Sequence, residues 1–87
     1  MAKGGTMREF VERIITALVE HPDKVQVNEF KGQATTIIEV DVDPSDRRFV
    51  IGKHGRNIDA IRHLVSCVAI ARKQRVRLHL AEDDPQP

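Results

Sequence analysis

The chain of 87 residues is 40% hydrophobic, which suffices for one small domain but not for two separate cores. Its single cysteine, Cys67, excludes an intramolecular disulfide, and the histidines match no metal-site spacing, so we expect no metal or cofactor. Neither a membrane-spanning run nor a secretory signal is recognisable, which favours a cytoplasmic location. No combination of nucleophile, base and acid predicts an enzyme.

Charge is distributed unevenly along the chain. Residues 1–46 hold five Lys or Arg against nine Asp or Glu, whereas residues 47–81 hold nine basic residues against one acidic residue, Asp59. Three more carboxylates follow in residues 82–87, so the formal net charge is only +1. The basic segment indicates a face that attracts polyanions, and the alternative is an unevenly charged, solvated surface.

A helix is predicted near the N-terminus, after a leader at residues 1–5 that we expect to be flexible. Thr6 and Glu9 fit a capping box, in which each side chain accepts a hydrogen bond from the other's backbone N–H. Apolar residues follow at helical spacing, and Pro22 should end the helix near Glu20.

Two strands are predicted next, over residues 25–30 and 36–42, joined by a short turn at residues 31–33. Such a pair forms an antiparallel hairpin. Phe30 falls on the face opposite Val27, so we expect a bulge or the end of the strand there.

The second half of the chain predicts two helices. Ser45 is expected to cap a short helix that runs to about Ile51, and a long helix should extend from about Arg56 to Gln74. The inner face of the long helix should consist of six apolar residues: Ile58, Ile61, Leu64, Val65, Val68 and Ala69.

The elements follow the order α-β-β-α-α-β. A last strand is predicted over residues 76–80, and the two helices before it form a crossover, which makes the second and third strands parallel. Each strand has one apolar face, so the helices should cover only one side of a three-stranded mixed sheet. We therefore predict an α+β two-layer sandwich over residues 6–81, followed by a disordered acidic tail at residues 82–87.

The candidate site is the loop between these two helices, together with its flanks: Ile51, Gly52, Lys53, His54, Gly55, Arg56 and Ile58. Two glycines three residues apart allow a sharp turn and let a phosphate approach the backbone. Unpaired amides at the start of the following helix favour an anion, and the basic side chains add positive charge and donors. The two isoleucines should anchor the turn to the core and border an aliphatic groove.

The stretch V-I-G-K-H-G-x-x-I-x-x-I, residues 50–61, resembles the motif of KH domains. The element order is that of the type II, or prokaryotic, variant, and the length and N-terminal helix resemble the KhpA family of small bacterial RNA-binding proteins over about residues 7–81. The resemblance implies binding of single-stranded RNA, with residues 52–55 clamping the backbone of about four nucleotides and with Ile51 and Ile58 beside the base groove.

The resemblance also implies a cellular role: an RNA chaperone or post-transcriptional regulator, linked to cell-wall homeostasis and cell-length control. Self-association, or pairing with a multidomain KhpB-like protein, is implied as well. The chain has three Phe and no Tyr or Trp, so it lacks the aromatic surfaces on which RRM and OB-fold domains stack bases. The short turn at residues 31–33 provides almost no second jaw, so we expect weak binding with little sequence selectivity.

Two alternatives stay open. The KH scaffold can serve as a protein-interaction module that does not itself contact RNA. Ile70 points away from the apolar stripe of the long helix, and it is either an isolated exposed residue or a contact for a second copy or another partner.

Overall fold

The described chain, residues 6–81 of a computed structural model, follows the predicted order α-β-β-α-α-β. The expected leader at residues 1–5 and tail at residues 82–87 lie outside the described residues. The helices and strands are α1 (Met7–Leu18), β1 (Gln26–Lys31), β2 (Thr36–Asp41), α2 (Arg47–Ile51), α3 (Arg56–Ala71) and β3 (Val76–Leu80). No helix within residues 6–81 has the length and apolar character needed to cross a membrane.

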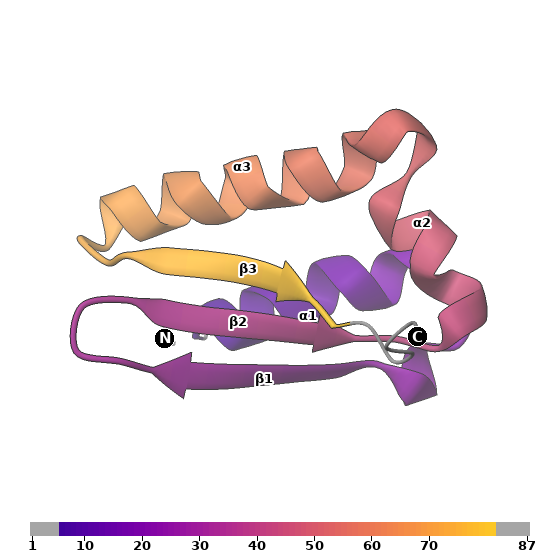
Figure 1. Cartoon of the computed structure of the whole chain (residues 1–87), viewed down its shortest axis with the longest axis horizontal. Coiled ribbons are helices and arrows are strands. Elements are labelled where there is room, and N and C mark those ends of the chain that lie inside the picture. The colour runs from indigo at the N-terminus through magenta and orange to yellow at the C-terminus, as the bar shows by residue number, and fades with distance from the viewer. Residues whose placement is uncertain (1–5, 82–87) are drawn as a thin grey trace, which may run out of the picture.

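The three strands form one mixed sheet in the order β1-β2-β3. β1 pairs antiparallel with β2, and β3 pairs parallel with β2 after the crossover through α2 and α3. Helices cover one face of the sheet, with α1 behind the strands and α3 running alongside β3 (Figure 1). The predicted two-layer α+β sandwich is therefore confirmed.

α1 begins as predicted and ends earlier than predicted. The Thr6 hydroxyl accepts from the Glu9 amide, and the Glu9 carboxylate accepts from the Thr6 amide, both at 3.2 Å, which completes the capping box. The helix ends at Leu18 rather than near Glu20, because the chain turns to let the amides of Glu20 and His21 donate to a distant carboxylate, described below.

The core lies between the helices and one face of the sheet. Its fully buried side chains come from several elements: Val11 and Ile15 of α1, Ile38 and Val40 of β2, Val50 of α2 and Val65 of α3. Leu64, predicted on the inner face of α3, is instead 46% exposed. The small sheet and α1 cover only a narrow arc of α3, and Leu64 lies at its margin.

β1 continues past Phe30 without a bulge. Its register with β2 is continuous from Gln26 opposite Asp41 to Lys31 opposite Thr36, so there is no bulge, and the strand ends at Lys31, one residue after Phe30. Strict alternation puts Phe30 on the face of the sheet that no helix covers, where it is 54% exposed.

The helix ends in the second half also differ from prediction. Asp43, not Ser45, caps the 3₁₀ turn Pro44–Asp46 that precedes α2, because its carboxylate accepts from both the amide and the hydroxyl of Ser45. α3 ends at Ala71 in a Schellman motif, in which Lys73 adopts φ 58° and the Gln74 amide bonds the Ala69 carbonyl at 2.8 Å.

Candidate nucleic-acid interface

The loop between α2 and α3 is a tight turn with three residues at positive φ. Gly52 has φ 79° and ψ 171°, His54 has φ 59°, and Gly55 has φ 72°. The Gly52 amide bonds the Arg48 carbonyl at 2.8 Å, and the Gly55 amide bonds the Gly52 carbonyl at 3.1 Å. These closing bonds do not use the amides of Lys53 and His54 at the tip.

The two glycines are required for different reasons. A Cβ at Gly52 would lie 2.6 to 2.8 Å from Cγ, Cβ and the amide nitrogen of Asn57, so no side chain fits there. A Cβ at Gly55 would meet no atom within 4 Å. The surface above Gly55 is therefore open, and its missing side chain lets another molecule approach the backbone.

Asn57 fixes the turn from the side of α3. Its Nδ2 donates to the Phe49 carbonyl at 2.8 Å and so ties the start of α3 to the last turn of α2. This bond satisfies a carbonyl at a helix end that lacks an intrahelical partner. The sequence analysis did not single out Asn57, although its place two residues after the second glycine suits such a brace.

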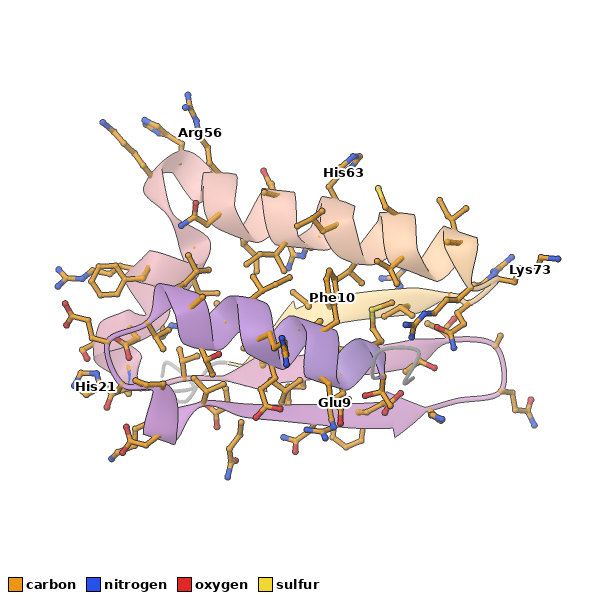
Figure 2. All side chains as sticks on the ribbon, turned by 180° about the vertical axis from the view of Figure 1, so that it is seen from behind. Glu9, Phe10, His21, Arg56, His63 and Lys73 are labelled. Atoms are coloured by element: carbon orange, nitrogen blue, oxygen red, sulfur yellow. The ribbon has the colours of Figure 1, made fainter. Side chains whose placement is uncertain are left out.

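Positive charge gathers at the turn. Lys53, His54 and Arg56 are all exposed, and Figure 2 shows Arg56 projecting away from the sheet at the corner where α2 meets α3. The first acidic residue of α3 is Asp59, which lies in the first turn of the helix. The exposed tip thus presents cations to solvent beside an accessible backbone, an arrangement that suits a phosphate.

The predicted groove residues Ile51 and Ile58 lie mainly in the hydrophobic core. Ile58 is only 8% exposed, and Ile51 is half-buried against the same cluster. They anchor the ends of the loop, as expected. A contact with bases stays a prediction for both.

A groove of about 520 Å³ lies where α3 runs along β3. Its walls come from both elements and from one residue of β2: Ile37, Arg62, Val65, Ser66, Val76, Arg77, Leu78 and His79. The floor is aliphatic, and two arginines and a histidine stand at the rim. β3 is an edge strand, so its outer backbone groups also face this side. Sequence reasoning missed this groove, because it depends on where α3 lies against the sheet.

A buried carboxylate holds the two halves of the fold together. Asp46 is fully buried and accepts three hydrogen bonds: from the Glu20 amide at 3.2 Å, the His21 amide at 2.9 Å and His21 Nδ1 at 3.0 Å. Burial raises the pKa of Asp46, but the hydrogen bonds from Glu20 and His21 outweigh it, and the pKa lies below its ordinary value. The hydrogen bond to Asp46 raises the pKa of His21. This pair lies at the end of α1 and shapes the fold, not the loop.

Residues 6–81 contain no group of three or more His, Cys, Asp or Glu side chains that could hold a metal ion. Cys67 is a free, exposed thiol.

Comparison with known proteins identifies close relatives that match nearly the whole chain. The RNA-binding protein KhpA of Caldanaerobacter subterraneus subsp. tengcongensis is 50% identical over 70 residues, which cover 80% of this chain and 93% of that protein. The RNA-binding protein KhpA of Halalkalibacterium halodurans is 43% identical over 76 residues, which cover 87% of this chain and 100% of that protein. These relatives are named as binding proteins rather than enzymes.

Solved structures of Era share the fold. A crystal structure of Aquifex aeolicus Era bound to GDP·AlF4⁻ superposes with a TM-score of 0.58 at 22% identity, over 85% of this chain and 29% of that longer chain. Era in complex with MgGDPNP and nucleotides 1506–1542 of 16S ribosomal RNA gives a TM-score of 0.59, also at 22% identity, over 85% of this chain and 28% of that one.

The family model for the KH domain of KhpA and KhpB matches residues 8–80. This chain belongs to the KhpA/KhpB KH-domain family.

Proposed function

We propose that this protein binds single-stranded RNA, with the backbone held at the loop Gly52–Gly55 and the bases along the groove between α3 and β3. The observation that carries the proposal is the open surface above Gly55, at the start of α3, which is bordered by exposed cations. Its relatives KhpA are named RNA-binding proteins, and one Era structure of the same fold holds ribosomal RNA, which supports the same ligand class.

The loop and the groove would bind different parts of the RNA: the loop its phosphates, and the groove its bases. Phosphates carry the charge that Lys53 and Arg56 attract. The amides of Lys53 and His54 offer donors next to Gly55, which has no side chain to block the approach of a phosphate. The aliphatic floor of the groove suits the faces of unpaired bases, while Arg62 and Arg77 at its rim suit phosphates or base edges. A short footprint contacts only a few phosphates, so the salt dependence should be shallow, roughly −0.7 per phosphate contacted.

The double variant Lys53→Asp/His54→Asp tests this proposal. Both side chains are exposed at a surface turn, so the fold should persist while binding of short mixed-sequence RNA oligomers is abolished. Fluorescence anisotropy measures the binding, and circular dichroism reports the fold. Lys53→Asp alone is compared with Lys24→Asp, which makes the same charge change at another exposed lysine on the acidic half of the chain.

The proposal fails if the double variant binds RNA as well as the wild type, or if Lys24→Asp weakens binding as much as Lys53→Asp. The second outcome would mean that net charge alone governs the interaction. If the wild type binds no RNA but forms a stable complex with another protein, the chain is a protein-interaction module instead.

We also propose the cellular role that the family resemblance implies. The protein would act in the cytoplasm as an RNA chaperone or post-transcriptional regulator, linked to cell-wall homeostasis and cell length. Enrichment of particular transcripts after cross-linking in cells, with loss of that enrichment in the loop variant, tests the role.

A second proposed function is contact with a second copy or with a KhpB-like protein through the outer side of α3. On this helix Ile70 is 76% exposed and Leu64 is 46% exposed. Figure 2 shows His63, the residue before Leu64, pointing away from the sheet. Uncharged exposed residues of this kind favour a protein partner. Ile70→Asp should lower the solution mass from a dimer to a monomer, and an unchanged mass would remove Ile70 from the contact.

A further inference from the structure

On the open face of the sheet, one row across the three strands consists of two apolar residues and an arginine. Phe30 of β1 lies opposite Ile37 of β2, and Ile37 lies opposite Arg77 of β3. Phe30 is 54% exposed and Ile37 is 42% exposed, because no helix covers this face (Figure 1). Two strand spacings of about 4.8 Å each separate the ring from the arginine, so the row is about 10 Å wide.

This row is continuous with the groove proposed to hold bases. Ile37, Arg77 and His79 line the groove, yet the alternation of the strands also puts them on the open face. The groove therefore wraps around the edge strand β3 and reaches the open face. An RNA chain that leaves the groove across β3 would meet Arg77 first, then Ile37 and finally Phe30.

Charge favours this row over the rest of the open face. The next row is formed by Asn28, Glu39 and His79, and the row after it contains Asp41, so carboxylates lie toward the far end of β2. The row that contains Phe30 has no carboxylate and one arginine. A polyanion is therefore attracted to the first row and repelled from the others.

We infer that Phe30 stacks on a base of the bound RNA beyond the nucleotides held by the loop and groove, with Arg77 on the adjoining phosphate. The inference rests on the proposed RNA binding and extends its footprint onto the sheet. An exposed ring stacks on any base, because every base has an aromatic face. The added contact raises affinity without adding sequence selectivity.

Oligomer length tests the inference. The wild type should bind an eight-nucleotide RNA more tightly than a four-nucleotide RNA, and Phe30→Ala should lose about tenfold in affinity for the longer RNA alone, in the range expected for one stacked base. Phe30→Tyr keeps the ring and should bind both oligomers as the wild type does. Thermal unfolding of each variant checks that the sheet is intact.

A direct readout is available because the chain contains no Trp. Phe30→Trp introduces the sole indole, whose fluorescence the eight-nucleotide RNA should quench and the four-nucleotide RNA should not. The inference is overturned if Phe30→Ala binds both oligomers as the wild type does, while Lys53→Asp/His54→Asp binds neither; the proposed function then stands without it. If the wild type binds neither oligomer, the proposed function itself fails, and the inference fails with it.

Discussion

Alanine at each of the two loop glycines should produce clearly different losses of stability. Gly52 has φ 79° and ψ 171°, a region that is essentially restricted to glycine and costs other residues about 1 to 3 kcal/mol. Alanine there also meets Asn57 Cβ and N at 2.8 Å and Cγ at 2.6 Å, and overpacking of this kind costs about 1 to 3 kcal/mol more. Gly55→Ala pays only for the left-handed backbone, about 1 to 2 kcal/mol, because its Cβ meets nothing.

These penalties are large for a chain of this size. A domain of 87 residues has a free energy of unfolding of about 4 to 13 kcal/mol, so a loss of about 3 kcal/mol at Gly52 is a substantial part of it. At about 4 to 8 °C per kcal/mol, a loss of about 3 kcal/mol in Gly52→Ala should lower the Tm by about 12 to 24 °C, and a loss of about 1 to 2 kcal/mol in Gly55→Ala should lower it by about 4 to 16 °C.

Urea unfolding followed by far-ultraviolet circular dichroism measures both variants. Asn57→Ala should not rescue Gly52→Ala, because two of the three close atoms, Cβ and the amide nitrogen of residue 57, remain. Equal losses at the two glycines, or a larger loss at Gly55, would refute the reasoning that residue 57 closes one side of the turn and leaves the other side open.

Three further predictions concern the hydrogen bonds that hold the two halves of the fold and the loop. The pKa of Asp46 is lowered in the folded state, so its stabilising effect is present above about pH 3.8 and is lost as pH falls through the folded-state pKa. The difference in urea midpoint between wild type and Asp46→Asn should therefore shrink as the pH is lowered from 6. Because the folded pKa of His21 is raised, its contribution is full below about pH 6.5 and is lost as pH rises through the folded value, so the midpoint difference between wild type and His21→Gln should shrink from pH 6 to pH 9. Asn57→Ala should lower the free energy of unfolding by about 1 kcal/mol, because the Phe49 carbonyl loses its hydrogen-bond partner. An unchanged urea midpoint would show that this hydrogen bond does not stabilise the turn.

Local patterns predicted most of the fold. The capping box at Thr6 and Glu9, the alternation of Ile38, Val40 and Val42, and the paired glycines all act over a few residues, and each appears as expected. The parallel pairing of β2 and β3 followed from the crossover between them, because connection rules leave few topologies open.

Features that depend on distant parts of the chain were missed. Asp46 reads as an ordinary polar turn residue, and its burial depends on amides 25 and 26 residues away. The groove depends on how α3 lies along β3, which no single segment specifies. Helical spacing gave Leu64 an inward position, but the width of the surface that covers α3 depends on the small sheet and on α1.

Phe30 and Asp46 depart in opposite directions from the rule that apolar side chains are buried and charged ones exposed, and the reasons differ. A buried carboxylate is stable only when it is hydrogen-bonded, and Asp46 accepts three bonds that join the end of α1 to the segment before α2; its position is explained by the fold alone. An exposed ring makes no comparable bond, so the fold gains little from Phe30, and a smaller or polar residue would satisfy the open face of the sheet equally well. The fold thus accounts for Asp46 but not for Phe30, and the row through Ile37 and Arg77 that joins Phe30 to the groove is the reason for inferring that its ligand is RNA.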